Sequence, residues 1–351
     1  MTESEIRHWM AQALAEARKG IGRTTPNPPV GAVIVKEGRE IARGWHRKAG
    51  LPHAEREALS SLLHQEAKGA TIFVTLEPCS STGRTGACCD ALIEAGVARV
   101  IYGARDPNPA HGGQADEILR AAGIEVLAGV LEKECQEVIR GFTSVQTKER
   151  PWVIAKTAIS LDGRITRPSG EGQWLSSEEA RRGVQRLRGE VDAIITSGAT
   201  LRADDPALTI RDPKVLGDRK QPRRVVFTKR DTDWSGYRMF QDKDRGQNLV
   251  FGNLPLYDNL RTLALDHGLS TVLVEAGGDL LGSLNDEGLI DEWVIYLTPL
   301  VTGGPAVGLG GKGAVTLDDR LGLDDLTIER VGPDLRARGL VRREKPRVLE
   351  R

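Results

Sequence analysis

Two hydrophobic periods organise the N-terminal part of the chain. Apolar residues at helical spacing predict an amphipathic helix over residues 5–19, and residues 35–41 have the strand, turn, strand pattern of a hairpin. The predicted strands are residues 32–35, 71–76, 100–103 and 125–128, and the predicted helices are residues 53 to about 64, 90–95 and 115–122. This order of elements is typical of a three-layer α/β domain.

A second domain is predicted after a polar segment at residues 145–151, which ends in a proline. The predicted strands are residues 152–159, 191–196, 224–228, 248–251, 271–274 and 293–297. A helix is predicted over residues 178–187. At its start, Ser176 and Glu179 have the spacing of a capping box. We therefore expect two α/β domains, at residues 1–147 and 151–345.

Composition narrows the class of protein. The chain has 351 residues, of which 39% are hydrophobic, and 49 basic residues balance 49 acidic ones. Zero net charge and 4% aromatic residues disfavour a protein that grips long nucleic acid. No stretch has the length or apolar character of a signal peptide or membrane span, so we expect a cytoplasmic protein without a nucleic-acid or membrane partner.

A metal-site pattern lies in the first ninety residues. His53-Ala54-Glu55 is followed by Pro78-Cys79 and then by Cys88, which together offer an imidazole, two thiolates and a carboxylate. This is the ligand set of a catalytic zinc ion with an open fourth position, and Glu55 is the candidate general acid and base. The pattern predicts a hydrolytic deaminase acting on an amidine carbon of a ring. The alternative is that the cysteines are small buried hydrophobes.

Asn27 lies in a loop that three prolines stiffen ahead of the strand at 32–35. A rigid loop can present a fixed amide to a flat heterocycle, although a simple Asn turn gives the same pattern.

In the second half, Lys156 interrupts an apolar strand, and acidic residues and Arg211 follow in a turn-rich segment. A lysine in such a strand needs a partner or a cleft, so these groups suggest a site for a polar anionic ligand. Gly277 and Gly278 stand between a strand and a helix, where backbone amides can bind a phosphate. A simple tight turn is the alternative for this glycine pair.

Taken together, the motifs resemble the bifunctional deaminase/reductase family of riboflavin biosynthesis (RibD-like) over nearly the whole chain. In the first half the matching segments are Asn27 to Ala32, His53 to Glu55, Thr75 to Ser80, Gly83, Thr85, Cys88 and Asp106 to Pro109. In the second half they are Lys156, Ser160 to Gly163, Gln173, Trp174, Ala203 to Arg211 and Val274 to Gly277. The gap between Cys79 and Cys88 is typical of this family and selects Cys88 over Cys89 as the zinc ligand.

The resemblance implies a cytidine-deaminase-like three-layer α/β domain followed by a dihydrofolate-reductase-like α/β domain. It implies one Zn²⁺ per chain and NADPH as the second cofactor. The substrate would be a phosphorylated pyrimidine, 2,5-diamino-6-ribosylamino-4(3H)-pyrimidinone 5′-phosphate, which is deaminated and then reduced at its ribosyl group. A homodimer or homotetramer is usual in such a family.

The resemblance also assigns site residues one by one. The expected NADPH contacts are Ala158, Trp174, Thr200, Asp204, Gly277, Gly278, Asp279, Leu280, Leu281 and Gly282. The expected substrate contacts are Asn27, Lys156, Arg188, Leu208, Arg211 and Glu275. The two arginines suit a 5′-phosphate because a guanidinium binds phosphate through two parallel hydrogen bonds.

Several positions depart from the family pattern. These are Ser81, Gly86-Ala87 in place of Pro-Pro, the segment after Pro109 that includes His111, Gly172 in place of serine, and Thr228-Lys229 in place of Asp-Ser. None is a zinc ligand or Glu55. They leave three alternatives: a monofunctional deaminase with a silenced reductase-like domain, a binding or scaffold protein with a structural zinc, and a nucleic-acid base deaminase with an accessory domain.

Overall fold

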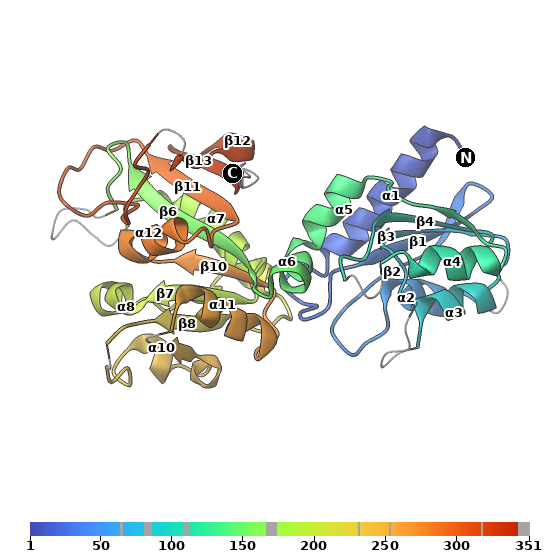
Figure 1. Cartoon of the computed structure of the whole chain (residues 1–351), viewed down its shortest axis with the longest axis horizontal. Helices are drawn as coiled ribbons and strands as arrows, with labels where there is room; N and C mark the ends of the chain where they lie inside the picture. The colour runs from blue at the N-terminus through green and yellow to red at the C-terminus, as the bar shows by residue number, and fades with distance from the viewer. Residues whose placement is uncertain are drawn as a thin grey trace, which may run out of the picture. The chain divides into compact units, whose positions relative to one another are not determined.

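The computed structural model describes residues 1–63, 66–80, 86–108, 112–165, 174–230, 232–252, 254–316 and 319–342. The chain folds into two compact units (Figure 1). One contains Met1–Pro151 with Ala264–Ser270, and the other contains Trp152–Leu263 and the residues from Thr271 onward. Some positions that entered the sequence analysis lie outside the described residues: His64, Ser81, Gly83, Thr85, Pro109, His111, Gly172 and Gln173.

The first unit is built on a five-stranded sheet in the order β2-β1-β3-β4-β5. Its strands are β1 (Gly31–Lys36), β2 (Arg39–Trp45), β3 (Thr71–Leu76), β4 (Arg99–Ala104) and β5 (Glu125–Leu127). Its helices are α1 (Glu3–Arg18), α2 (Ala54–Ser60), α3 (Cys88–Glu94), α4 (Gln114–Ala121), α5 (Glu132–Val138) and α6 (Arg140–Lys148). β1 is antiparallel to β2 and β3, whereas β3, β4 and β5 are parallel.

Two glycines show how helices cover both faces of this sheet. A Cβ on Gly31 would lie 2.1 Å from the Ala13 carbonyl oxygen of α1, and a Cβ on Gly44 would lie 2.5 Å from the Ala58 nitrogen of α2. Gly31 pairs with Trp45 across the hairpin, so Gly44 faces the opposite side of the sheet. α1 and α2 therefore pack on opposite faces, which completes the three layers.

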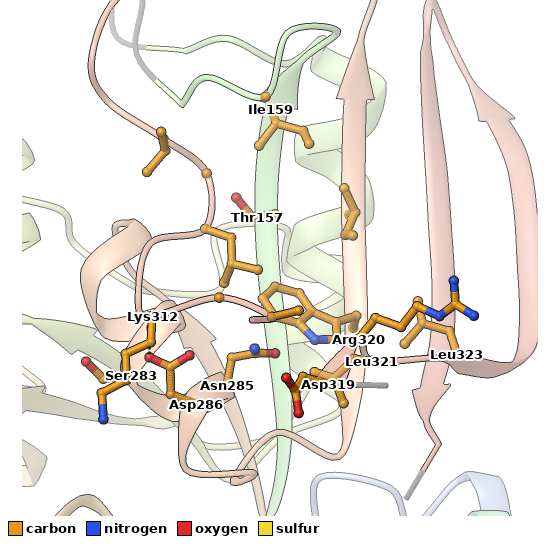
Figure 2. Close-up of a pocket in the computed structure, with 18 of the residues that line it drawn as sticks. Thr157, Ile159, Ser283, Asn285, Asp286, Lys312, Asp319, Arg320, Leu321 and Leu323 are labelled. Atoms are coloured by element: carbon orange, nitrogen blue, oxygen red, sulfur yellow. Dashed lines mark hydrogen bonds between the residues drawn. The ribbon is translucent and has the colours of Figure 1, made fainter. Parts of the chain in front are cut away.

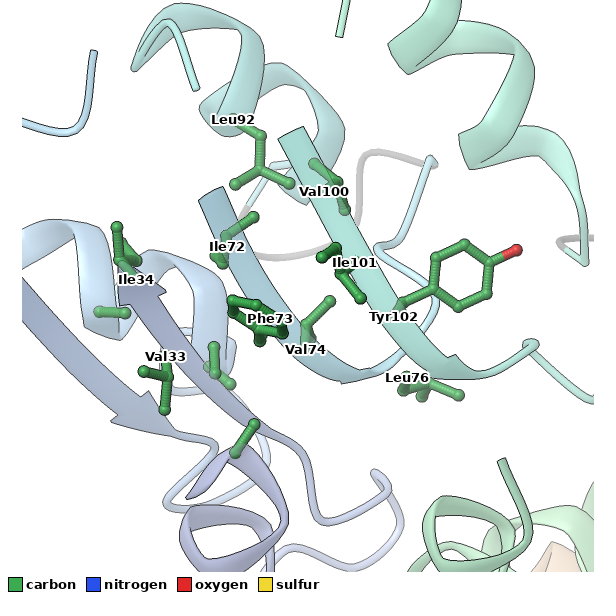
Figure 3. Close-up of a cluster of buried hydrophobic side chains, with 14 of the residues drawn as sticks. Val33, Ile34, Ile72, Phe73, Val74, Leu76, Leu92, Val100, Ile101 and Tyr102 are labelled. Atoms are coloured by element: carbon green, nitrogen blue, oxygen red, sulfur yellow. The ribbon is translucent and has the colours of Figure 1, made fainter. Parts of the chain in front are cut away.

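The core of the first unit lies between these layers (Figure 3). All six residues of β3 are buried, as expected for a central strand covered on both faces. Phe73 of β3, Ile101 of β4 and Leu92 of α3 are fully buried in this cluster. Each such side chain contributes roughly 1.5–3 kcal/mol through burial, and their packing fixes the strand ends on which the site is built.

The second unit contains an eight-stranded sheet in the order β12-β13-β11-β6-β10-β7-β8-β9. Its strands are β6 (Trp152–Ser160), β7 (Ala193–Ser197), β8 (Arg223–Phe227), β9 (Leu249–Phe251), β10 (Thr271–Glu275), β11 (Glu292–Thr298), β12 (Leu323–Val331) and β13 (Asp334–Val341). The six strands from β11 to β9 are parallel, and β13 and β12 continue the sheet antiparallel.

Helices connect the parallel strands of the second unit. They are α7 (Glu178–Gly189), α8 (Gly198–Asp204), α9 (Pro213–Leu216), α10 (Arg238–Gln241), α11 (Leu256–Leu265) and α12 (Gly278–Asp286), with a 3₁₀ turn η1 (Arg245–Gln247). α7 buries Val184 and Leu187 against Ile154 of β6 and Tyr296 of β11. Because the parallel strands end at one edge, β6, β7 and β10 bring their last residues together there.

The structure changes some details of the predicted elements. α2 ends at Ser60 rather than near residue 64, and α3 begins at Cys88 rather than at residue 90. α5, α6 and the β12–β13 hairpin were not predicted from the sequence. Ser177, not Ser176, caps α7 by accepting a hydrogen bond from the Ala180 amide, so the expected capping box is not formed. None of the helices among the described residues is long and apolar enough to span a membrane.

Candidate active sites

Three predicted metal ligands converge in the first unit. His53 is the N-cap of α2, Cys79 follows β3, and Cys88 is the first residue of α3. His53 Nδ1 lies 3.5 Å from Cys79 Sγ and 3.4 Å from Cys88 Sγ, and the three donor atoms all lie within 4.8 Å of one another. Tetrahedral zinc with S and N ligands separates its donor atoms by roughly 3.5–3.8 Å, so this set fits zinc.

Backbone hydrogen bonds fix the two cysteines relative to each other. The Cys88 amide donates to Cys79 Sγ at 3.3 Å, and the Cys88 and Cys89 amides donate to the Cys79 carbonyl oxygen. The Cys89 thiol is buried and instead donates to the Pro78 carbonyl oxygen at 3.8 Å. Burial raises the Cys89 pKa to about 12, which keeps this thiol protonated. The geometry therefore favours Cys88 over Cys89 as the ligand.

The two candidate thiolates have opposite pKa shifts. Hydrogen bonds from Cys88 and His53 lower the pKa of Cys79 to about 4. The pKa of Cys88 is raised because its proton is shared with the Cys79 thiolate and the site is buried. Without a metal ion, Cys79 is therefore readily ionised and Cys88 keeps its proton. A bound divalent cation would favour the thiolate form of Cys88 as well.

Glu55 lies in the first turn of α2, beside a cavity of about 200 Å³ that His53 and Cys79 also line. The side chain is almost fully buried, and this burial, together with the neighbouring Cys79, raises its pKa to about 7. A carboxyl group with a pKa near neutrality can both accept and release a proton at pH 7. The position and pKa of Glu55 suit the predicted proton carrier.

Asn27 also lines this cavity, together with His46, which the sequence analysis did not single out. His46 Nδ1 lies 3.0 Å from the Pro52 carbonyl oxygen, so it carries the ring proton and donates to that oxygen. His46 Nε2 is then an acceptor for the Asn27 amide NH₂, 3.1 Å away. This pairing fixes which way the Asn27 amide faces, a detail that no local sequence pattern encodes.

Glu77 is a second carboxylate of the same cavity that the sequence analysis missed. It accepts hydrogen bonds from the backbone amides of Gly113 at 2.7 Å, Asp106 at 3.2 Å and Ala115 at 3.3 Å. Gly113 is the N-cap of α4 and has no side chain that could cap the helix, so Glu77, which directly follows β3, caps it instead. Glu77 therefore ties the end of β3 to the segment that carries Asp106, another cavity residue.

In the second unit, Lys156 of β6 and Glu275 of β10 pair directly across two parallel strands. Arg188 of α7 donates to both carboxylate oxygens of Glu275, at 2.6 and 3.1 Å, and to the Thr209 carbonyl oxygen at 2.8 Å. Burial alone would raise the Glu275 pKa, but Arg188 and Lys156 outweigh it and hold that pKa below its usual value. Burial lowers the pKa of Lys156.

The predicted glycine-rich segment has a packing reason for its glycines. A Cβ on Gly278 would lie 2.4 Å from the Val307 carbonyl oxygen, and a Cβ on Gly282 would lie 2.3 Å from the Gly310 carbonyl carbon. Gly277 is not crowded in this way, and its amide donates to Thr200 Oγ1 at 2.9 Å. Close chain packing thus explains two of the glycines, whereas Thr200 positions the start of α12.

The remaining predicted residues occupy the same unit in different surroundings. Asp204 ends α8, and burial raises its pKa. Burial and the nearby Arg188 lower the pKa of Arg211. Trp174 is half exposed, with the Arg181 guanidinium 5.0 Å from its ring centre. Five further predicted residues divide into two groups: the side chains of Leu208 and Leu281 are buried, and those of Ala158, Asp279 and Leu280 are more accessible.

A larger hollow of about 1,210 Å³ lies elsewhere in the second unit, between the β6–β11 face and residues 307–315 and 319–323 (Figure 2). Thr157 and Ile159 of β6 line it, as do Asn285 and Asp286 at the end of α12. None of the expected NADPH or substrate contacts lines this hollow, although Asp162 and Gly163 of the matching motif do. The predicted NADPH and substrate contacts are therefore not part of the lining of this hollow.

Both halves of the chain are similar to known proteins. Residues 3–104 match the cytidine and deoxycytidylate deaminase zinc-binding region, and residues 151–337 match the RibD C-terminal domain. The riboflavin biosynthesis protein RibD of Escherichia coli is 39% identical, over 93% of this chain and 97% of its own length. That of Aquifex aeolicus is 36% identical, over 94% of this chain and 96% of its own length.

Solved structures give the same relation. RibD of Acinetobacter baumannii superposes with a TM-score of 0.89 at 34% identity, covering 97% of this chain and 100% of its own. The diaminohydroxyphosphoribosylaminopyrimidine deaminase/5-amino-6-(5-phosphoribosylamino)uracil reductase of Thermotoga maritima has a TM-score of 0.86 at 33% identity, covering 97% and 99%. With both domain types present in one chain, this protein belongs to the RibD family of bifunctional deaminase/reductases of riboflavin biosynthesis.

Proposed function

We propose that the chain catalyses two consecutive steps on one phosphorylated pyrimidine. Residues 1–147 would deaminate 2,5-diamino-6-ribosylamino-4(3H)-pyrimidinone 5′-phosphate with release of ammonia. Residues 151–345 would then reduce its ribosyl group to give 5-amino-6-ribitylamino-uracil 5′-phosphate. The observation that carries the proposal is the convergence of His53, Cys79 and Cys88 beside the buried carboxyl group of Glu55.

In the deamination, His53, Cys79 and Cys88 would hold one zinc ion, which supplies hydroxide at neutral pH. Glu55 takes up the proton of the attacking water and passes it to the departing amine, as its pKa of about 7 allows. Asn27 holds the pyrimidine ring against this carboxyl group, because its amide is fixed by His46. The cavity of about 200 Å³ would accommodate one flat heterocycle.

In the reduction, NADPH would supply the hydride to C1 of the ribosyl group. Lys156 is the proton donor, because burial lowers its pKa and so makes its proton easier to release. Glu275 stays ionised because Arg188 and Lys156 lie close to it, and it holds Arg188 in place through two hydrogen bonds. Since Arg188 is already paired with Glu275, Arg211 is the main anchor for the substrate phosphate.

The NADPH contacts would lie along α8 and along the first half of α12. Thr200 and Asp204 of α8 and the Gly277–Gly282 segment form one side, and Ala158 and Trp174 complete the set. Leu281 would contribute through its backbone, since its side chain is buried in the core. Leu208, which is 4% exposed, similarly meets the substrate through its backbone.

The proposal extends to partners and location. We expect a cytoplasmic homo-oligomer, a dimer or tetramer, that binds the small phosphorylated pyrimidine and no nucleic acid or membrane. Exposed apolar side chains of the second unit, among them Val301, Val315 and Ile328, support self-association because they are costly to leave in water.

The test is a pair of separate assays on the purified protein. Ammonia release and NADPH oxidation are followed independently with the pathway pyrimidine, and zinc is measured by elemental analysis. We expect about one zinc per chain and both activities. Ammonia release without NADPH oxidation would leave the monofunctional deaminase, and zinc with neither activity would favour a binding or scaffold protein.

A further inference from the structure

The two residues before Cys88, Gly86 and Ala87, carry no polar side chain that could position this proposed zinc ligand. Gly86 has a φ of +71°, and Ala87 is the N-cap of α3 without a side-chain hydrogen bond. Glycine has more backbone freedom than any other residue, and Ala87 offers no side-chain polar group. Neither residue can fix by itself where α3 begins, and therefore where the Cys88 thiol lies.

A side chain from another helix supplies the missing constraint. Arg56, in the first turn of α2, donates from Nη2 to the Ala87 carbonyl oxygen at 2.8 Å. The guanidinium also packs on Gly86, since a Cβ built there would lie 2.9 Å from the same nitrogen. Arg56 thus reaches the two residues that immediately precede Cys88.

Part of the Arg56 guanidinium is withdrawn from water at this contact. The side chain is half-buried, and its Nε atom is buried with no hydrogen-bond partner among the residues that the structure describes. Withdrawing a guanidinium N–H from water costs free energy, so the chain accepts a cost to keep this group against the Gly86–Ala87 segment.

With the hydrogen bond from Arg56 to Ala87, all three proposed zinc ligands are connected to one another. Cys79 and Cys88 are joined by the Cys88 amide, and His53 shares α2 with Arg56. Through the Ala87 carbonyl, Arg56 links the helix that begins at His53 to the helix that begins at Cys88. We propose that Arg56 is a positioning residue of the zinc site, which holds Cys88 at binding distance before the metal arrives. This inference rests on the proposed zinc site.

The test compares three variants in zinc affinity. Arg56→Met keeps most of the aliphatic stem and removes the donor; Arg56→Lys keeps the charge without the planar fork. Arg47→Met is the matched control, because Arg47 also contacts α2, through Glu57, but is exposed. The zinc dissociation constant of each is measured by competition with a chromophoric chelator, and metal-free stability by urea unfolding.

Removing a group that orients a metal ligand typically costs 10–100-fold in metal affinity. We expect Arg56→Met to weaken zinc binding about tenfold or more, Arg56→Lys to fall between it and wild type, and Arg47→Met to stay within about twofold. The metal-free stabilities of wild type and Arg56→Met should be similar.

Two results would overturn the inference. One is equal zinc affinity in Arg56→Met and wild type. The other is a loss of metal-free stability in Arg56→Met that accounts for the whole change in affinity, which would make Arg56 a packing residue only. A wild-type protein that binds no zinc would instead refute the proposed deaminase site itself.

Discussion

Glu55 in the first unit and Glu275 in the second are both largely buried in a candidate site, and the two have opposite pKa shifts. Glu55 in the first unit forms no ion pair with a described residue, and burial raises its pKa to about 7. Glu275 in the second unit is held by Arg188 and lies beside Lys156, and its pKa is lowered. Burial is common to both, so the neighbouring cations decide the direction.

This difference separates two uses of the same side chain. A carboxyl group that titrates near pH 7 can carry a proton in each catalytic cycle. A carboxylate locked between two cations keeps its charge and serves as a fixed support for the groups around it. Glu55 should therefore act as a proton carrier and Glu275 as a fixed anion, and variants at and around the two residues can test this difference.

The largest expected effect is on Glu55. Glu55→Gln keeps the shape of the side chain but cannot carry a proton, so deamination should fall by roughly 100-fold or more. Zinc content and NADPH oxidation with already deaminated substrate should not change. Glu57→Gln, on the same helix but in a surface pair with Arg47, is the control. A parallel fall in both activities with the fold intact would contradict two independent sites.

Arg188→Met should leave Glu275 without its bidentate partner. Removing one member of a buried ion pair typically costs about 3–5 kcal/mol, because the remaining charge stays uncompensated. We expect a loss of this size in the unfolding of the second unit, measured with urea. The control is Arg182→Met on the same helix, where the pair with Glu178 is exposed and contributes about 0.3–0.5 kcal/mol. Equal effects would mean that Glu275 does not depend on Arg188.

Variants of Arg211 and Asp204 should distinguish substrate binding from cofactor binding. Arg211→Ala should raise the KM of the phosphorylated pyrimidine roughly 10- to 100-fold, since a hydrogen bond to a charged group is worth about 1.5–3 kcal/mol. NADPH affinity should hardly change. Asp204→Ala should instead weaken NADPH. Steady-state kinetics with each ligand varied in turn measures both effects, and the reverse pattern would overturn the assignment.

The smallest effects concern stability against pH in the metal-free protein. The folded pKa of Glu55 lies above its usual value of 4.5, so its contribution is present below about pH 4.5 and is lost as pH rises through about 7. The folded pKa of Glu275 lies below 4.5, so its contribution is present above that pH and is lost as pH falls through the folded pKa.

Urea unfolding of wild type, Glu55→Gln and Glu275→Gln between pH 4 and 8 measures these contributions. The difference between wild type and Glu55→Gln should shrink as pH rises, and that between wild type and Glu275→Gln should shrink as pH falls below about 5. The same sign of slope for both variants would show that the two carboxyl groups do not differ in the way described.

Some elements were predictable because their signals are local. β3 lies at the predicted residues, since a fully apolar run between turns leaves one choice, and α1 follows its helical period. The ends of α2 and the existence of α5 and α6 were not predicted, because their short polar sequences gain helical stability from packing rather than from propensity. The β12–β13 hairpin lacked the alternation that identifies a strand, since β12 is largely exposed.

The sequence by itself determined the family, the order of the two domains and the kinds of groups available for chemistry. The identity and spacing of His53, Glu55, Cys79 and Cys88 are properties of the chain, as is the lysine within an apolar strand. Only the tertiary structure decided that Glu77 caps α4, that Arg56 reaches Ala87, and that Arg188 is held by Glu275. Those contacts join residues far apart in the chain, and whether a buried charge is paired or left alone depends on which strands and helices meet around it.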